Sequence, residues 1–345
     1  MRRTFLPFLF GIIFLSSVAH AQWQTQESGT AADLRGLSVV SREVAWASGS
    51  RGTYVRTIDG GVAWQSAVVA GAEKLDFRDV HAIDANTAYL LSAGAGESSR
   101  IYKTSDGGGH WTLQYTSRNP QAFFDALAFW DPNHGIALSD PDGGHFLIIM
   151  TADGGATWKE VPRESIPPAL TGEAAFAASG TCLVVEGKNR VWFGTGGGSQ
   201  ARVFLSTDRG RTWKVSATPI VAGNSSSGIF SLAFRDAKHG IAVGGDYKKP
   251  ENAKDNVAIT ADGGQTWRLI KGSPPGGFRS CVACIPGTGG RSMVVVGPSG
   301  SDYSADGGDN WTSVGKEGYN TIGFAKAETA GWAIGPKGRI AKYQR

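Results

Sequence analysis

The feature that most constrains the fold of this chain is an eight-residue motif that recurs six times. Its clearest copy is T-A-D-G-G-Q-T-W at residues 260–267, and its copies combine an Asp with Gly, a final Trp and, in most of them, a preceding hydroxyl residue. Successive copies are 47, 47, 55, 54 and 44 residues apart. Regular spacing in this range indicates a repeat architecture with one supersecondary unit per copy. The repeated aspartates are Asp59, Asp106, Asp153, Asp208, Asp262 and Asp306.

The motif has a direct physical interpretation as a hairpin turn. An Asp early in a tight turn accepts hydrogen bonds from its own backbone, and the Gly residues that follow tolerate positive φ. A Ser or Thr two residues before the Asp adds a second hydrogen-bonding side chain, and the Trp begins the next strand as a large apolar plug. We therefore expect a structural role for the motif. Its residues match the Asp-box, or bacterial neuraminidase repeat, which is found in β-propellers.

A second pattern recurs between the motifs. It consists of a short strand, a polar turn and an apolar strand that ends in Gly, and it occurs seven times against six copies of the first motif. Each copy is typical of the two inner strands of a propeller blade. The clear copies cover 38–49, 127–139, 232–245 and 323–335, and the weaker ones cover 80–92, 174–194 and 281–297.

The ends of the chain account for this difference in number. The last copy stops at Arg345, where a seventh Asp would stand, and residues 22–25 resemble the outer strand at 63–66. An N-terminal strand that completes the last blade would close the ring and protect the sheet edges. We predict an all-β fold, a seven-bladed β-propeller of four-stranded antiparallel blades, in one domain over residues 22–345. A six-bladed ring is the main alternative.

Residues 1–21 have the pattern of a secretory signal peptide. Arg2 and Arg3 precede a short apolar run, and A-H-A precedes the expected cleavage site after Ala21. We expect an exported monomer, periplasmic or secreted, with no transmembrane anchor once the signal is removed. Basic minus acidic residues are then 34 − 2 − 30 = +2, which is too balanced to favour a nucleic-acid partner.

The cysteines carry no metal or redox signature. Cys281 and Cys284 form C-V-A-C in a predicted strand, where positions three apart point to opposite faces of the sheet. Together with Cys182 they are expected to be buried thiols. The sequence therefore predicts no cofactor and no metal site.

Strand direction separates the loops into two faces. The repeated motif and the turn between the first two strands of each blade share one face, so the second-to-third-strand loops and the connections between blades lie on the other. Function is expected on that second face, because binding loops vary on a rigid scaffold. Most long insertions fall there: 93–100, 139–145, 160–173, 193–202, 216–228 and 245–256.

Aligning the innermost strands places one residue of each blade at the channel mouth on this face. Arginines there suit a carboxylate ligand or an acidic segment of a partner. Ordinary salt-bridged surface arginines are the alternative. The predicted ring consists of Arg35, Arg78, Phe124, Glu173, Ile229, Arg279 and Tyr319.

Two of the expected loops carry a second group of candidate binding residues. Asp140, Asp142 and His145 stand in S-D-P-D-G-G-H, and Asp246, Tyr247 and Lys248 stand in G-G-D-Y-K-K-P. Two carboxylates and a His are able to bind a metal or transfer protons. The surrounding Gly and Pro are typical of ordinary turns, and an ordinary turn is the interpretation we favour.

Residues 22–345 resemble the photosystem II stability/assembly factor family, also described as having WD40/YVTN/BNR-like repeats. The resemblance rests on the repeated D-G-G-x-T-W, on strands such as G-I-A-V-G and on the stretches 175–181 and 228–236. It implies a non-enzymatic scaffold, from a bacterial relative of the family, that binds a protein partner. The implied partner is part of a membrane or envelope complex.

A glycoside hydrolase is the alternative function. Sialidases share the Asp-box and use arginines, a Tyr nucleophile and carboxylates, and Arg35, Arg78, Arg279, Tyr319 and Glu173 offer these residue types. The F-R-I-P-like signature of sialidases is absent from the sequence, and sialidases have six blades. We therefore predict no catalytic residues.

Overall fold

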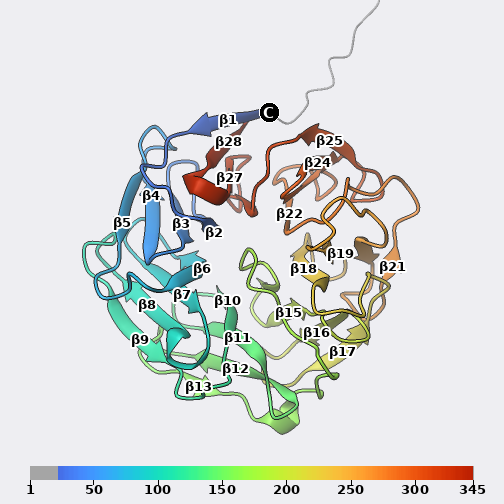
Figure 1. Ribbon diagram of the computed structural model, residues 1–345, viewed down its shortest axis with the longest axis horizontal. Coiled ribbons are helices and arrows are strands. Elements are labelled where there is room, and N and C mark those ends of the chain that lie inside the picture. The colour runs from blue at the N-terminus through green and yellow to red at the C-terminus, as the bar shows by residue number, and fades with distance from the viewer. Residues whose placement is uncertain (1–21, 345) are drawn as a thin grey trace, which may run out of the picture.

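The computed structural model describes residues 22–344, which form seven four-stranded antiparallel sheets arranged as blades around a central channel (Figure 1). The prediction of seven blades is confirmed, and the six-bladed alternative is wrong. The predicted signal peptide at 1–21 lies outside the described residues. Within residues 22–344, no helix has the length and apolar character that crossing a membrane would require.

Each blade is formed by consecutive strands, except the last, which takes its outer strand from the start of the described chain. Blades one to three contain β2 (Leu34–Val39), β3 (Ala45–Gly49), β4 (Thr53–Thr57) and β5 (Gln65–Val68); β6 (Asp76–Ala82), β7 (Ala88–Ala93), β8 (Arg100–Thr104) and β9 (Thr112–Thr116); and β10 (Phe124–Phe129), β11 (Gly135–Asp142), β12 (His145–Thr151) and β13 (Lys159–Glu160).

The remaining four blades follow in chain order, and three short 3₁₀ helices lie in the connections. The strands are β14 (Leu183–Glu186), β15 (Arg190–Gly194), β16 (Arg202–Ser206) and β17 (Lys214–Ala217); β18 (Ser227–Phe234), β19 (Gly240–Asp246), β20 (Val257–Thr260) and β21 (Arg268–Leu269); β22 (Cys281–Cys284), β23 (Met293–Gly297), β24 (Gly300–Ser304) and β25 (Thr312–Gly315); and β26 (Thr321–Phe324), β27 (Gly331–Ile334), β28 (Ile340–Gln344) and β1 (Gln22–Gln26). The helices are η1 (Gly96–Ser98), η2 (Arg163–Ser165) and η3 (Pro336–Gly338).

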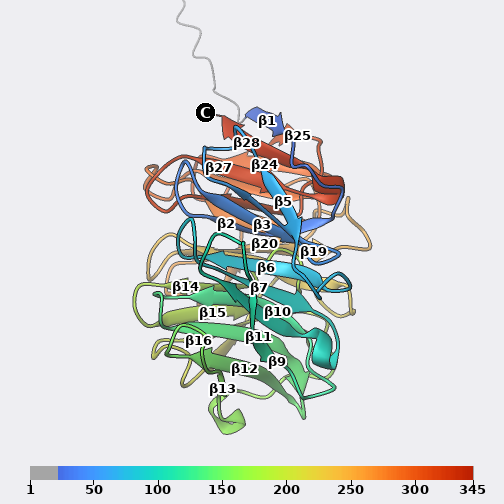
Figure 2. The same cartoon turned by 90° about the vertical axis from the view of Figure 1, so that its left-hand side faces the viewer.

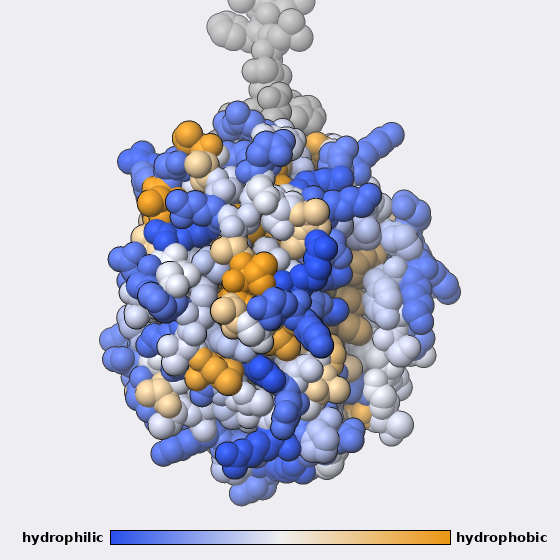
Figure 3. All heavy atoms as spheres, turned by 60° about the vertical axis from the view of Figure 1, so that its left-hand side comes forward, coloured by the Kyte–Doolittle hydropathy of each residue, from blue (hydrophilic) through white to orange (hydrophobic). Residues whose placement is uncertain are grey.

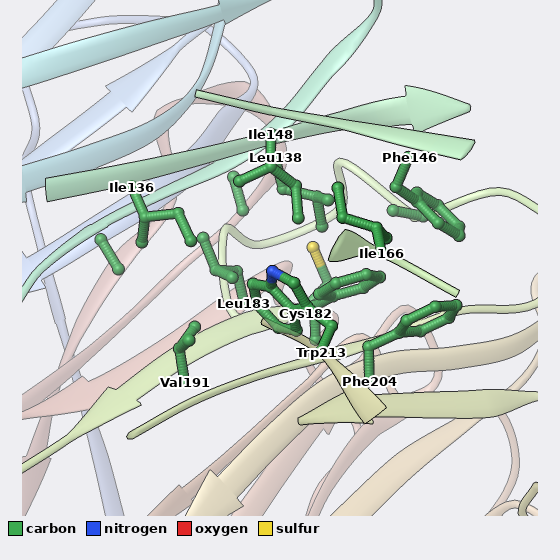
Figure 4. Close-up of a cluster of buried hydrophobic side chains, with 14 of the residues drawn as sticks. Ile136, Leu138, Phe146, Ile148, Ile166, Cys182, Leu183, Val191, Phe204 and Trp213 are labelled. Atoms are coloured by element: carbon green, nitrogen blue, oxygen red, sulfur yellow. The ribbon is translucent and has the colours of Figure 1, made fainter. Parts of the chain in front are cut away.

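The hydrophobic core lies between neighbouring blades. Figure 2 shows the sheets lying face to face, so a middle strand such as β3 or β19 is buried on both sides. Figure 4 shows one such cluster between the third and fourth blades, where Phe146, Phe204 and Trp213 pack around Cys182. On the surface that Figure 3 presents, apolar side chains occur in small groups separated by polar ones. Cys182, Cys281 and Cys284 are all free thiols.

The ring closes as the sequence predicts. β1 pairs with β28 over five residues, from Gln22 opposite Gln344 to Gln26 opposite Ile340. Trp23 packs against Tyr319 with ring centroids 5.4 Å apart. The Gln26 side-chain oxygen accepts hydrogen bonds from the indole N–H groups of two Trp residues in the first and last blades, Trp64 at 3.0 Å and Trp332 at 2.9 Å. This short strand therefore joins two blades that are distant in sequence.

Deleting residues 22–26 is expected to lower the melting temperature by about 10 °C or more. The reason is that the free energy of unfolding loses on the order of several kcal/mol with the strand pairing and the Trp23 packing. Thermal unfolding of the shortened and the intact protein tests this. The control is Gln24→Ala on the exposed side of the same strand, which is expected to change stability by less than about 0.5 kcal/mol. An unchanged melting temperature after the deletion contradicts ring closure by β1.

The six repeated turns share one hydrogen-bond pattern. At 260–267 the Thr260 hydroxyl donates to Asp262 (2.8 Å) and accepts from the backbone N–H of Gly264, while Asp262 accepts from the backbone N–H of Thr266 (2.9 Å). The same three bonds form in the other five turns. Arg209 replaces the first Gly of the fourth turn and adopts the same left-handed backbone, with φ +64°. The side chains thus fix each turn from within.

The repeated turns also define one face of the ring. In every case the residue after the Asp donates its backbone N–H to a carbonyl in the turn between the first two strands of the same blade, as Gly60 does to Glu43 (2.9 Å) and Gly263 to Lys238 (2.7 Å). Four of the six turns also accept a side-chain hydrogen bond from the preceding blade, for example Gly154 from Tyr89 (2.8 Å). The connections of interest for binding therefore lie on the opposite face.

Asp262→Ala is expected to lower the free energy of unfolding by about 1–2 kcal/mol at pH 7, because backbone and hydroxyl donors in the turn lose their acceptor. Partial burial opposes ionisation of Asp262, but hydrogen bonds from Thr266 and Thr260 outweigh it and hold the pKa at about 2. A depressed pKa stabilises the fold above the ordinary value near 3.8 and loses that effect as the pH falls towards 2. Urea unfolding measures the difference in free energy of unfolding between Asp262→Ala and the unchanged protein, and this difference should shrink below pH 4. A difference that is constant down to pH 2 contradicts a stabilising role of the ionised Asp262.

Candidate functional site

A β-bulge marks the start of the innermost strand in four of the seven blades. In β2, Leu34 pairs with Gly49 and Gly36 with Ser48, so Arg35 is an extra residue with no partner in the register. The same interruption isolates Arg78 in β6, Asp125 in β10 and Phe230 in β18. A bulge turns its extra side chain out of the regular alternation of a strand. All four of these side chains line one cavity at the channel mouth.

This central cavity has a volume of about 430 Å³, within the range of small-ligand and peptide-side-chain pockets. Its walls come from connections on the face opposite the repeated turns, including the segment before β14 and the β19–β20 loop. Besides the four bulge residues, it is lined by Phe123, Asp140, Ala175, Phe176, Ala177, Ala178, Tyr247, Phe278, Ser280, Pro298 and Asn320.

The predicted channel-mouth ring matches these residues in the first two blades only. Arg35 and Arg78 line the cavity as predicted, whereas in four other blades the lining residue is the next one along the chain. Neighbouring residues of a strand point to opposite sides, so an error of one residue moves a side chain out of the cavity. The backbone N–H groups of Ile229, Arg279 and Tyr319 donate hydrogen bonds to the adjacent blade. The cavity contains Asp125 in place of Phe124, Phe230 in place of Ile229, Ser280 in place of Arg279 and Asn320 in place of Tyr319.

Arg279 and Glu173, both predicted at the ring, lie in buried ion pairs away from the cavity lining. The Arg279 guanidinium donates to Asp302 at 2.7 Å, and both side chains are less than 5 % exposed. The Glu173 carboxylate is fully buried against Arg202, which donates to it at 2.9 Å, and it also accepts from the Thr195 hydroxyl. Tyr319 is buried against Trp23. Each of these side chains joins parts of its own blade.

The second predicted group separates in the structure. The expected loop at 139–145 is instead the tip of a hairpin, because Gly143 and Gly144 both have positive φ and permit a two-residue turn between β11 and β12. Asp140 turns into the cavity, while Asp142 points to Asn119 and Arg163 on the outside. His145 pairs opposite Asp142 in the strand register. No group of three or more His, Cys, Asp or Glu within residues 22–344 is arranged to hold a metal ion.

The β19–β20 connection contributes one residue to the cavity. Asp246 is buried and accepts hydrogen bonds from the Ser226 hydroxyl (2.6 Å) and the backbone N–H of Lys248. The pKa of Asp246 is lowered, and the largest cause is the bond from Ser226. Tyr247 is 46 % exposed and stands on the cavity rim. Lys248 is exposed beside it. Asp246 therefore fixes the turn that presents Tyr247.

Two partly neutralised arginines form the basic part of the cavity. Arg78 donates to Asp76 at 2.7 Å and to the carbonyl of Ala177 at 3.3 Å. Arg35 has only a loose ion pair with Asp33, at 3.8 Å. Burial, and secondly the charge of Arg78, lower the pKa of Arg35. The two guanidinium groups thus repel each other and retain N–H donors for a further acceptor.

Two carboxyl groups lie beside these arginines. Asp125 is 1 % exposed, and neither of its oxygens has a hydrogen-bond partner among the described residues. Burial and then the neighbouring Asp140 raise the pKa of Asp125 well above its usual range, and Arg78 only partly opposes this. Asp140 accepts a hydrogen bond from the backbone N–H of Ala175 (2.9 Å), and burial raises its pKa to about 6. Burial therefore favours the protonated, neutral form of Asp125.

The opposite wall of the cavity is aromatic. Phe176 stacks on Phe230 with ring centroids 3.9 Å apart and an interplanar angle of 11°. Phe278 meets Phe230 edge to face at 4.6 Å, and Tyr247 does so at 6.0 Å. Phe176 belongs to the connection before β14, which enters the channel and is held by the bond from Arg78 to Ala177. The cavity thus combines a charged side with an apolar one.

A second hollow, of about 330 Å³, lies on the repeated-turn face between the fifth and sixth blades. Its charged residues already have partners: Arg268 lies 3.6 Å from Asp309, and His239 lies 2.8 Å from Asp236. Its Asp306 and Thr266 belong to the repeated turns. The central cavity is the better candidate because both oxygens of Asp125 have no hydrogen-bond partner among the described residues and its arginines retain free donors.

The fold of this chain occurs in solved structures of other proteins. No protein-family model matches the chain, and no curated protein matches it in sequence. A structure of YCF48 bound to D1 peptide has 17 % identity and a TM-score of 0.67, over 94 % of this chain and 97 % of that one. YCF48 from Cyanidioschyzon merolae gives the same score and identity over 93 % and 98 %. What these proteins share with the chain is the propeller fold.

A glycoside hydrolase also has this fold. The GH74 enzyme of Niastella koreensis is 17 % identical with a TM-score of 0.63, over 92 % of this chain and 53 % of that one. The chain therefore spans about half of that enzyme. Because one fold is shared by a peptide-bound protein and an enzyme, function has to be argued from the cavity.

The ion pairs give a test that separates structural from cavity arginines. Arg279→Met leaves Asp302 as an unpaired buried charge and is expected to lower the free energy of unfolding by about 3–5 kcal/mol. Arg35→Met removes a partly exposed, loosely paired group and should cost less than about 1 kcal/mol. Urea unfolding of both variants measures the difference. Equal destabilisation contradicts the placement of Arg35 in an open cavity.

Proposed function

We propose that this protein is a non-enzymatic scaffold that binds an exposed segment of a protein partner in the central cavity. The observation that carries the proposal is the cavity itself, in which Arg35 and Arg78 with unused donors face an aromatic wall around Phe230. Bulges on a rigid ring hold these side chains in place. A preorganised site of this kind loses little entropy when a ligand binds.

The chemistry of the two walls specifies the segment. Guanidinium groups suit a carboxylate, and the stacked Phe176 and Phe230 suit an aromatic or branched apolar side chain. The ligand is therefore an acidic residue with an apolar neighbour in an accessible part of the partner. The peptide bound by YCF48, a protein of similar fold, supports peptide binding as the mode of action.

The proposed place of action is outside the cytoplasm. The basic and apolar pattern of residues 1–21 supports export, and a partner in a membrane or envelope complex accords with it. In this proposal the protein acts as a monomer, because one ring contains the whole cavity. The net charge of +2 without the signal supports a protein partner over nucleic acid.

Peptide binding can be measured with an array of short peptides that place Asp or Glu next to Phe, Leu or Ala, followed by calorimetry of the best binder. Arg35→Ala with Arg78→Ala is expected to weaken binding at least 30-fold, or about 2 kcal/mol for two charge-assisted contacts. Phe176→Ala should weaken peptides with Phe or Leu more than those with Ala.

The control for the double variant is Arg42→Ala, an exposed arginine on the repeated-turn face with a side-chain exposure of 72 %. It removes the same kind of charge at a distance from the cavity and should leave the affinity unchanged. Binding that survives loss of both cavity arginines overturns the proposed site.

Glycoside hydrolysis is the second candidate, favoured by the two carboxyl groups Asp125 and Asp140 in one cavity and by the fold shared with a GH74 enzyme. A carboxylic acid that keeps its proton near pH 7 is suited to general acid catalysis. A panel of chromogenic glycosides and polysaccharides distinguishes the two functions. Turnover that Asp125→Asn abolishes would replace the scaffold proposal with the enzyme.

A further inference from the structure

The charges around the central cavity do not favour an anion while every carboxyl group is ionised. Asp33 and Asp76 offset the charges of Arg35 and Arg78, and Asp125 and Asp140 then add two negative charges. A ligand carboxylate would enter a site of net charge −2. Each proton that Asp125 or Asp140 takes up removes one of these charges, so anion binding and protonation of the pair favour each other.

The geometry gives Asp125 a particular part in this coupling. It is the bulged residue of β10, it lines the cavity next to Arg78, and both of its oxygens lack partners among the described residues. A buried carboxyl group without a partner is costly to leave unsatisfied. A protonated Asp125 has one O–H to donate, and an acceptor held by Arg35 and Arg78 would lie beside it.

We propose that Asp125, as a carboxylic acid, donates a hydrogen bond to the carboxylate of the ligand, so that binding at this site takes up a proton from solvent. The inference rests on the proposed function, since it requires an acidic ligand in the central cavity. It adds that Asp125 determines specificity for a carboxylate over its uncharged amide. It also makes the affinity fall as the pH rises.

The surroundings of Asp125 support this assignment. The groups that face it are Arg78 on β6, Asp140 on β11 and, in the connection before β14, the buried thiol of Cys182, whose pKa burial raises first and the nearby carboxylates second. Asp79 on β6 also acts on that thiol, but it already accepts hydrogen bonds from Val80 (2.8 Å) and Leu127 (2.7 Å). The backbone N–H groups of Ala177 and Asp140 act on Asp125 and partly oppose the rise of its pKa, but among these carboxyl groups within residues 22–344 it alone accepts no hydrogen bond of ordinary geometry.

The sign of the pH effect follows from the raised pKa values. Burial and then the neighbouring Asp140 raise the pKa of Asp125 well above the usual range of an aspartate. Burial raises the pKa of Asp140 to about 6. As the pH falls through this region both groups gain protons, and an anion meets less repulsion. Above the apparent pKa of Asp125 the affinity should fall about tenfold per pH unit, because one proton must be regained for each ligand bound.

The test uses three small probes with the same phenyl group: 3-phenylpropanoate, 3-phenylpropanamide and 3-phenylpropylamine. Calorimetry or NMR titration between pH 5.5 and 9.5 gives their dissociation constants with the intact protein. We expect the carboxylate to bind at least tenfold more tightly than the amide at pH 6 and to lose this advantage by pH 9. Calorimetry in two buffers of different ionisation enthalpy, repeated across this pH range, should show proton uptake on binding wherever the affinity falls with rising pH.

Asp125→Asn keeps a permanent N–H donor at the same place. It should bind 3-phenylpropanoate with an affinity that no longer changes between pH 7 and 9, and with no proton uptake there. Asp125→Ala removes the donor and should bind the carboxylate no better than the amide. Glu328→Gln, a partly exposed site on the repeated-turn face, is the control and should behave as the unchanged protein. Melting temperatures establish that all three variants are folded.

Each outcome decides between the two proposals. Carboxylate binding that is independent of pH and equal in Asp125→Asn overturns the role of Asp125 while leaving an acidic ligand in place. If the amine binds and the carboxylate does not, the cavity is a cation site and both the acidic ligand and the proton coupling are wrong. If none of the probes binds at any pH, the central cavity is not the binding site and the proposed function fails with it.

Discussion

The hydrogen bonds around the six repeated aspartates are the interaction on which the rest of the structure depends. Within each turn the carboxylate and a hydroxyl side chain satisfy the backbone, and the next residue ties the turn to its own blade, as Gly60 does to Glu43. Four turns also accept a hydrogen bond from a side chain of the preceding blade. Because these turns fix the blades on one face of the ring, the connections on the opposite face are free to carry insertions and unsatisfied polar groups.

The channel face uses this rigidity through its bulges. A regular innermost strand would point the side chains of Arg35, Arg78, Asp125 and Phe230 in alternation with their neighbours, and the bulges instead direct all four into one cavity. The residue before each bulge packs between blades and is apolar in these four strands. Arg279 occupies the equivalent place in the sixth blade, which explains why it needs Asp302 as a buried partner. One strand geometry thus separates structural residues from cavity residues.

The sequence predicts the fold far better than it predicts the site. The D-G-G-x-T-W repeat and the resemblance of 22–25 to 63–66 lead directly to seven blades and to closure by β1, because both depend on local turn chemistry and strand pairing. The site depends on a register that is defined to a single residue. Bulges carry no clear local signal, so Asp125 and Phe230 were missed in favour of Phe124 and Ile229. The recurrence of Phe in 175–181, 228–236 and 277–279 was the available signal for the aromatic wall.

We propose above all that the partner binds at the cavity on the face opposite the repeated turns. It is tested most directly by photo-crosslinking from two positions of equal exposure, Tyr247 on the cavity rim and Leu113 on an outer strand, each 46 % exposed. Each residue is replaced in turn by a photoreactive phenylalanine analogue, and adducts with the best-binding peptide are mapped by mass spectrometry. We expect strong labelling from position 247, suppressed by loss of Arg35 and Arg78, and background labelling from position 113. Equal labelling from both positions, or labelling that is insensitive to the arginines, would contradict it.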